Sequence, residues 1–73
     1  MGKTAKEIKS GRLRNGEFTE AQLKKDIEML VDPKIPVKKI EWHLFGGADD
    51  SMIQILEKLK RIYGAEKFDY ILY

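Results

Sequence analysis

In residues 37–64, VKKIEWHLFGGADDSMIQILEKLKRIYG, the spacing of the apolar residues changes from every second residue to about 3.6 residues. At residues 37–45 the apolar side chains of Ile40, Trp42 and Leu44 alternate with more polar ones, which is typical of a strand with one buried face. After a Gly-Gly pair the spacing becomes helical, with apolar residues at Met52, Ile55, Leu56, Leu59, Ile62 and Tyr63. The stretch therefore predicts a strand that leads directly into an amphipathic helix.

The ends of this helix carry recognisable signals. Ser51 followed by Gln54 forms a capping box, so we expect the helix to start at Ser51. Gly64 fits the position just after the last helical residue, because glycine adopts a positive φ without strain. Residues 67–73 then alternate again and predict a last strand.

The N-terminal part repeats this order. Residues 4–9 predict a short strand, and Thr19 with Gln22 predicts a capping box for a first helix that ends at Asp32-Pro33. Phe18 is expected to pack on Leu23 as a hydrophobic staple across the helix start. The apolar stripe of this helix consists of Leu23, Ile27, Leu30 and Val31.

Strands that alternate with helices favour a parallel sheet with right-handed crossovers. The sequence therefore predicts an α/β domain over residues 1–73, with a three-stranded sheet in β-α-β-α-β order and two covering helices. A chain of 73 residues allows one domain, which buries only about 60% of its unfolded surface. At least one sheet edge would be bare, so either the chain is a piece of a larger domain or it pairs with a copy of itself.

The first predicted strand places a carboxylate beside an ammonium. Side chains at i and i+2 of a strand share a face, so Glu7 and Lys9 should stand together while Ile8 points into a core. Such a carboxylate can hold a divalent metal, and the lysine can orient water or stabilise developing negative charge. The alternative interpretation is a surface ion pair worth about 0–1 kcal/mol.

Composition limits the remaining function classes. The chain has no cysteine, one histidine and a net charge of +2, so a disulfide and a histidine-rich metal cage are both excluded. No apolar run is long enough to span a membrane, and residues 1–4 lack the apolar stretch of a signal peptide. We therefore expect the protein in a reducing compartment, the cytoplasm of a producing or target cell. Five basic residues precede residue 15, and they could either meet phosphates or solubilise an edge strand: Lys3, Lys6, Lys9, Arg12 and Arg14.

Three segments in order carry a resemblance to a known family. They are KEIKSG at residues 6–11, TEAQLKKDI at residues 19–27 and VKKIEWHLF at residues 37–45. Together they resemble the C-terminal portion of the restriction-endonuclease-like nuclease domains of bacterial polymorphic and contact-dependent inhibition toxins. In that family a Glu-x-Lys-Ser-Gly strand end precedes a helix with a glutamine, a strand ending in aromatics, a Leu-rich helix and a last hydrophobic strand.

The resemblance implies a function for each matching residue. Glu7 would bind Mg²⁺ or Mn²⁺, with the backbone carbonyl of Ile8 also facing the metal, and Lys9 would orient the attacking water or stabilise the transition state. Gln22 would line the site. The implied reaction is phosphodiester hydrolysis in DNA or RNA, and the implied partners are a nucleic acid substrate and an immunity protein.

The sequence departs from the family at one position. Such nucleases need an acidic residue on a strand upstream of the Glu-x-Lys strand, and none of the six residues before Glu7 is acidic. If the resemblance holds, the chain is the C-terminal half of a nuclease core and is expected to be inactive alone. The alternative function is a non-catalytic α/β interaction module that self-associates through a bare edge or binds a protein or nucleic acid.

Three further features carry two interpretations each. His43 either lines the site or is a hydrogen-bonded strand residue, and Trp42 is either core or a stacking platform. Gly46-Gly47 is either an anion cradle or a strand-to-helix turn. Because His43 and Phe45 end the second strand as Glu7 and Lys9 end the first, we expect all four at the same end of the sheet.

Overall fold

The computed structural model describes residues 2–73 as three strands and two helices in the predicted order. The elements are β1 (Lys3–Lys9), α1 (Glu17–Val31), β2 (Val37–Leu44), α2 (Asp50–Tyr63) and β3 (Phe68–Leu72). The α/β class and the β-α-β-α-β order predicted from the sequence are thereby confirmed.

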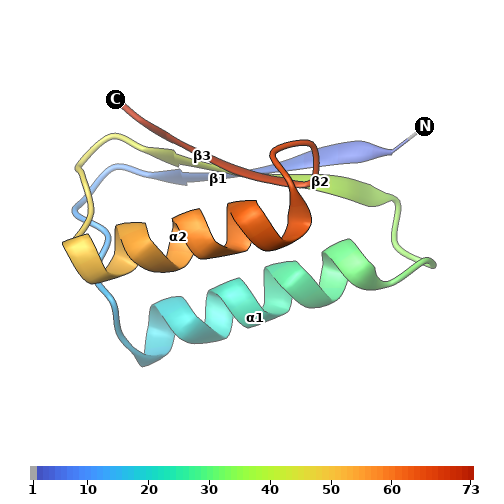
Figure 1. The fold of residues 1–73 in the computed structure, drawn as a ribbon, viewed down its shortest axis with the longest axis horizontal. Helices are drawn as coiled ribbons and strands as arrows, with labels where there is room; N and C mark the ends of the chain where they lie inside the picture. Colours follow the sequence, from blue (N-terminus) through green and yellow to red (C-terminus); the bar gives the residue numbers. More distant parts are fainter. Residues whose placement is uncertain (1) are drawn as a thin grey trace.

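The three strands form one parallel sheet in the order β1-β2-β3, with β2 in the centre (Figure 1). Trp42 lies at the middle of this register, beside Glu7 of β1 and Tyr70 of β3. Both helices lie on the same side of the sheet, because two crossovers of one hand that step in one direction place their helices on one face. Neither helix covers the opposite face of the sheet, which we call the open face.

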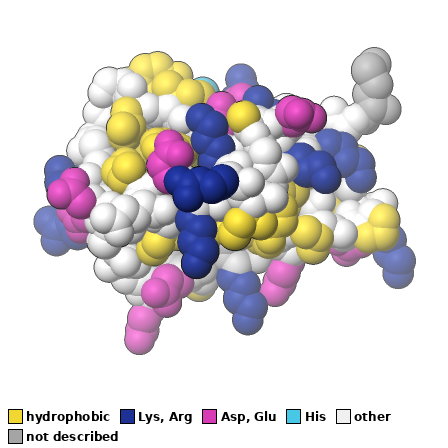
Figure 2. Space-filling view, viewed as in Figure 1, with side chains coloured by type: hydrophobic (Ala, Val, Ile, Leu, Met, Phe, Trp, Pro, Cys, Tyr) yellow, Lys and Arg dark blue, Asp and Glu magenta, His cyan; other side chains and the backbone are white. Residues whose placement is uncertain are grey.

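The core lies between the sheet and the two helices. Ile40, Trp42 and Leu44 of β2 are fully buried, as their alternation predicts. They pack in one cluster with residues from both helices, from β3 and from the loop after β1: Leu13, Leu23, Met52, Leu56 and Phe68. Figure 2 shows charged side chains of both signs over the outside, with apolar side chains exposed between them.

Both predicted helix starts are wrong by a few residues. The N-cap of α1 is Gly16, and Thr19 lies inside the helix, where its hydroxyl donates to the Arg14 carbonyl at 2.7 Å. Phe18 is 81% exposed, so it forms no hydrophobic staple. The N-cap of α2 is Asp49 and not Ser51, because the Asp49 carbonyl already accepts from the backbone N–H of Met52 at 2.9 Å.

The predicted end of α2 is correct. Gly64 follows the last helical residue with a φ of 86°, and its N–H donates to the Lys60 carbonyl at 2.7 Å. Within residues 2–73, β1 and β3 each pair with β2 only, so the outer edge of each carries no further strand. None of the described helices is long and apolar enough to cross a membrane.

Two substitutions in α2 test the placement of the core. Leu56 is 0% exposed and Ile62 is 62% exposed on the same helix. Leu56→Ala is expected to lower the free energy of unfolding by about 2–5 kcal/mol, since it leaves a cavity in the core. Ile62→Ala is the matched control and should change it by less than about 0.5 kcal/mol. Urea unfolding followed by circular dichroism measures both, and equal effects would contradict this core.

Candidate functional site

Glu7 and Lys9 share one face of β1, as predicted, but it is the face covered by the helices. The Lys9 Nζ lies 3.9 Å from Glu7 Oε2. The expectation that Ile8 points into the core is wrong, because Ile8 is 66% exposed on the open face. The register explains this outcome: Glu7 lies beside Trp42, whose side chain points toward the helices. The carboxylate and the ammonium therefore lie at the border of the core.

Gln22 joins this pair from the first turns of α1. The Lys9 ammonium donates to Gln22 Oε1 at 2.7 Å, and it lies 5.4 Å from the centroid of the Trp42 ring. Residues 13 positions apart in the chain are thus brought together by the packing of α1 on β1 and β2. The three side chains predicted as site residues from the sequence lie in one place.

Asp26 is a fourth polar side chain here, and sequence reasoning missed it. It is 3% exposed, and the Trp42 Nε1–H donates to its Oδ2 at 3.0 Å. Its position was readable from the sequence, because it follows Gln22 by four residues and Leu23 by three and so faces the same side of α1. A carboxylate within an apolar stripe indicates a buried partner or a function.

Burial and charge both act on Asp26. Burial raises the pKa of the Asp26 carboxyl above its ordinary value of 3.8, and the negative charge of Glu7 raises it further. The hydrogen bond from Trp42 and the positive charge of Lys9 oppose this rise. Asp26 therefore feels the charge of Glu7, and a cation bound by the two carboxylates would relieve their repulsion.

The oxygen donors suit a hard divalent cation in kind. Mg²⁺ is commonly bound through one or two carboxylates and keeps several waters, and Glu7 and Asp26 supply two carboxylates. The Ile8 carbonyl adds an oxygen at the outer edge of β1, since the neighbouring Lys9 carbonyl accepts from the Phe45 N–H of the loop after β2. Residues 2–73 contain no cluster of three or more His, Cys, Asp or Glu side chains with metal-binding geometry. Waters or a further donor would complete the shell.

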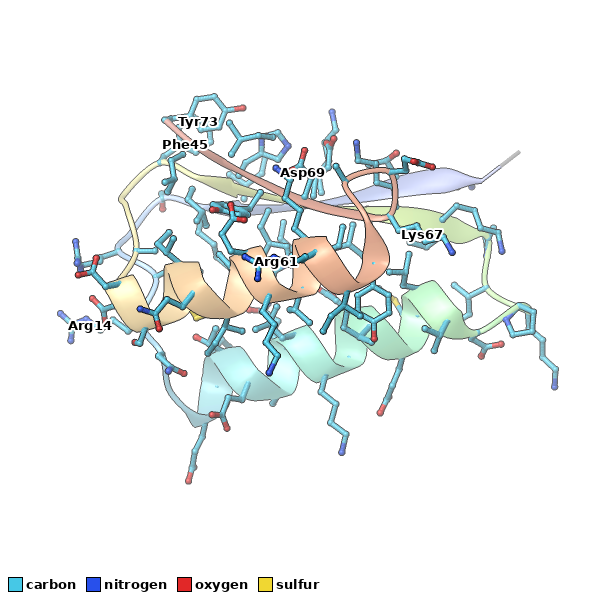
Figure 3. All side chains as sticks on the ribbon, in the orientation of Figure 1. Arg14, Phe45, Arg61, Lys67, Asp69 and Tyr73 are labelled. Atoms are coloured by element: carbon cyan, nitrogen blue, oxygen red, sulfur yellow. The ribbon has the colours of Figure 1, made fainter. Side chains whose placement is uncertain are left out.

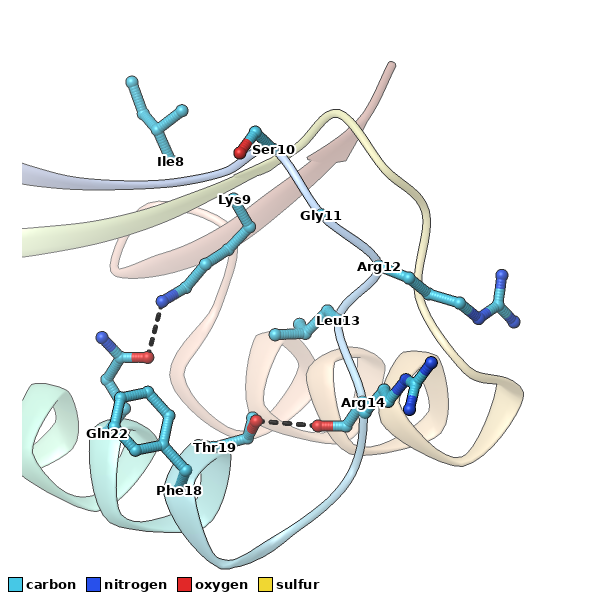
Figure 4. A pocket seen from close by; sticks show the side chains of 10 residues that line it. All are labelled: Ile8, Lys9, Ser10, Gly11, Arg12, Leu13, Arg14, Phe18, Thr19 and Gln22. Atoms are coloured by element: carbon cyan, nitrogen blue, oxygen red, sulfur yellow. Dashed lines mark hydrogen bonds between the residues drawn. The ribbon is translucent and has the colours of Figure 1, made fainter.

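A hollow of about 340 Å³ opens on the other side of Lys9, where β1 ends and α1 begins (Figure 4). Lys9 and Gln22 belong both to this hollow and to the carboxylate site. The loop after β1 forms one wall and the start of α1 the other. The lining residues are Ile8, Lys9, Ser10, Gly11, Arg12, Leu13, Arg14, Phe18, Thr19 and Gln22.

The loop of residues 10–14 is fastened to the turn of residues 46–49. Leu13 exchanges backbone hydrogen bonds with it, donating to the Gly47 carbonyl at 2.9 Å and accepting from the Asp49 N–H at 3.0 Å. The Arg12 Nε donates to Asp49 Oδ1 at 2.7 Å. Gly46-Gly47 is therefore a strand-to-helix turn that positions the basic loop.

His43 and Phe45 lie apart from Glu7 and Lys9. All four stand toward the same end of the sheet, as expected, but His43 and Phe45 belong to the open face, so the sheet separates them from Glu7 and Lys9. His43 Nδ1 lies 2.7 Å from the Tyr73 hydroxyl, and His43 Nε2 lies 3.3 Å from Glu41 Oε1. The Phe45 and Tyr73 rings stack at 4.1 Å, on the side away from the helices (Figure 3). His43 is thus a hydrogen-bonded strand residue.

Lys39 completes this group on the open face. Its Nζ lies 3.1 Å from Glu41 Oε2. The hydrogen bond from Lys39, with that from His43, lowers the pKa of the Glu41 carboxyl below its ordinary value. Lys39, Glu41 and His43 therefore form one group of paired side chains on the open face, apart from the carboxylate site.

Comparisons with protein-family models, curated proteins and solved structures found no match for this chain.

Asp26→Asn tests the buried carboxyl. A raised native pKa means that the folded state holds its proton more tightly than the unfolded state, so the native protein loses stability as pH rises from about 4 through that pKa. The amide keeps an oxygen for the Trp42 N–H and cannot ionise. We expect Asp26→Asn to be more stable than the wild type at neutral pH, with an advantage that shrinks toward about pH 4.

Thermal unfolding at several pH values measures this advantage. Glu66→Gln is the control, because it makes the same kind of change, from a carboxylate to an amide, at an exposed position. An Asp26→Asn protein that is less stable than the wild type at neutral pH would contradict the burial argument.

Gly46→Ala tests how closely the two loops are packed. A Cβ at Gly46 would lie 2.5 Å from the carbonyl carbon of Gly11, which is a backbone atom and cannot turn aside. We expect a loss of about 1–3 kcal/mol in the free energy of unfolding, as for other overpacked positions. Gly11→Ala is the control, since its Cβ would meet nothing within 4 Å. Urea unfolding compares the two variants, and equal stabilities would rule out this contact.

Proposed function

We propose that this chain is a metal-dependent nuclease module that hydrolyses phosphodiester bonds in a nucleic acid, as its resemblance to the restriction-endonuclease-like toxin domains implies. One observation supports this function above all. The Glu7 carboxylate and the Gln22 amide both lie against the Lys9 ammonium, at the carboxyl end of β1. In open α/β sheets, ligands bind at this end of the strands.

Each residue has a chemical task in this proposal. Glu7, together with Asp26, whose carboxyl senses the charge of Glu7, would hold Mg²⁺ or Mn²⁺, and the bound ion would polarise a phosphoryl oxygen and activate water. Lys9 stabilises the negative charge that develops on the phosphoryl group. Gln22 fixes the position of the ammonium through its 2.7 Å hydrogen bond. The buried Trp42 ring beneath Lys9 excludes water from that side and strengthens the local electrostatics.

Asp26 is a candidate for the second acidic residue, which the sequence lacks upstream of Glu7. The resemblance requires a second carboxylate, and Asp26 supplies one from α1 in place of a strand. Its bond to Trp42 fixes one of its oxygens, and its pKa is raised. We therefore expect weak metal binding by the chain alone, and full activity only where a further acidic segment completes the site. In the toxin setting, the protein that blocks this site would be an immunity protein.

Glu7→Gln tests the metal site. We expect Mn²⁺ affinity to fall by at least about tenfold, because the carboxylate that the metal contacts most directly becomes a neutral amide. Mn²⁺ binding followed by electron paramagnetic resonance measures this affinity. Glu20→Gln, at an exposed position of the first turn of α1, is the control and should bind as the wild type does.

A nuclease assay completes this test. DNA and RNA are each incubated with Mg²⁺ and with the wild type or Glu7→Ala. Because the chain alone lacks the further acidic segment, we expect at most weak cleavage by the wild type and none by Glu7→Ala. Cleavage that survives Glu7→Ala at the wild-type rate would refute the proposed role of Glu7. Unchanged Mn²⁺ affinity in Glu7→Gln would refute the metal site itself.

A second candidate function is a non-catalytic interaction module. The observation that favours it is the open face of the sheet, where Ile8, Phe45 and Tyr73 are all more than half exposed beside two bare strand edges. Exposed apolar side chains next to unpaired edges favour self-association. Size-exclusion chromatography with light scattering distinguishes a monomer from a dimer, and a monomer at high concentration speaks against pairing with a second copy.

A further inference from the structure

The hollow beside Lys9 carries two side chains that hydrolysis itself does not use, Phe18 and Arg14. We propose that this hollow binds one unpaired nucleotide of a single-stranded nucleic acid, with the Phe18 ring stacked on the base and the Arg14 guanidinium on the adjoining phosphate. This inference rests on the proposed nuclease function, because it identifies where the substrate strand lies next to the reacting phosphate.

The Phe18 side chain takes no part in the packing of the core. It is 81% exposed, the largest exposed fraction among the large hydrophobic residues of the described chain. The core of the protein is complete without it, since Phe18 belongs neither to the buried cluster nor to the residues packed against it. An exposed ring at the mouth of a hollow presents a flat face to a ligand, and base stacking on such rings is sequence-tolerant.

Arg14 supplies a positive charge on the opposite wall. Figure 4 shows Phe18 and Gln22 on one side of Thr19 and Arg14 on the other. Among residues 2–73, Arg12 pairs with Asp49, whereas Arg14 forms no salt bridge. Arg12 therefore holds the loop in place, and the charge of Arg14 remains for a phosphate.

The hollow is already in its binding shape. Thr19 donates to the Arg14 carbonyl at 2.7 Å, which ties the loop to α1. The backbone bonds of Leu13 tie the same loop to the turn before α2. Because Phe18 stands on a helix and Arg14 on a loop fixed at both sides, a ligand would order little of the backbone on binding.

The position of the hollow relative to Lys9 indicates how a bound nucleic acid strand would run. Lys9 lines the hollow and also lies 3.9 Å from Glu7. A nucleotide held by Phe18 and Arg14 would thus place the next phosphate of its strand near Lys9. A base within a duplex has no free face for Phe18, so the hollow should select single strands over duplexes.

Binding is measured without cleavage, by fluorescence anisotropy of labelled oligonucleotides with the wild-type chain and a chelator present. Single-stranded DNA, single-stranded RNA and duplex DNA of one length form the three arms. The test variants are Phe18→Ala and Arg14→Gln. Their matched controls on α2 are Ile62→Ala and Arg61→Gln, which remove an exposed apolar group and a positive charge outside the hollow.

The two test variants should fail in different ways. Phe18→Ala should weaken single-strand binding by about fivefold to a hundredfold at every salt concentration, because one stacking contact is lost. Arg14→Gln should reduce the slope of log K against log salt by about 0.7, because one phosphate contact to a single strand is lost. The controls should bind within about twofold of the wild type, and circular dichroism should show all four variants folded.

Several results would overturn the inference. They are a Phe18→Ala protein that binds like Ile62→Ala, an Arg14→Gln slope equal to that of Arg61→Gln, duplex binding as tight as single-strand binding, or no salt-dependent binding at all. These outcomes leave the metal site untouched, since Mn²⁺ binding through Glu7 is measured separately. Conversely, loss of the metal site with retained stacking would refute the nuclease and leave the nucleotide site standing.

Discussion

The burial of Trp42 is the constraint on which the rest of the structure depends. Its indole ring lies at the centre of β2, fully buried under both helices. A buried indole N–H requires an acceptor, and Asp26 of α1 provides it at 3.0 Å. The same ring lies beneath the Lys9 ammonium of β1. One side chain thus fixes how α1 sits on the sheet and where the polar groups of the candidate site meet.

Much of this arrangement can be predicted from the sequence, because the spacing of apolar residues indicates which face of a strand or helix is buried. The alternation of Ile40, Trp42 and Leu44 and the helical stripe of α2 predicted both elements correctly. The stripe also predicted the inner face of α2, except at Ile62, which is 62% exposed. The pairing of Glu7 with Lys9 followed from the two-residue period of a strand. Gln22 joined them through a resemblance of three segments and not through any spacing rule.

The features that were predicted wrongly or missed depend on tertiary contacts, which cannot be inferred from the local sequence pattern. Thr19 looked like a cap, but its hydroxyl is taken by the Arg14 carbonyl of the preceding loop. Ile8 looked like a core residue, but both helices cover the opposite face of the sheet, so a polar pair was placed inside and an isoleucine outside. Asp26 was missed because its partner, Trp42, is 16 residues away in the chain. Its place within an apolar stripe was the one local signal.

Trp42 is the single tryptophan of the chain, and its ring lies beneath the Lys9 ammonium of the candidate site. Its indole contacts a carboxylate at one atom and faces an ammonium across the ring. Any rearrangement of these charges alters the electric field across the ring, and with it the colour and yield of the light that the ring emits. The emission of Trp42 therefore reports on the arrangement of charge around Lys9 and Asp26.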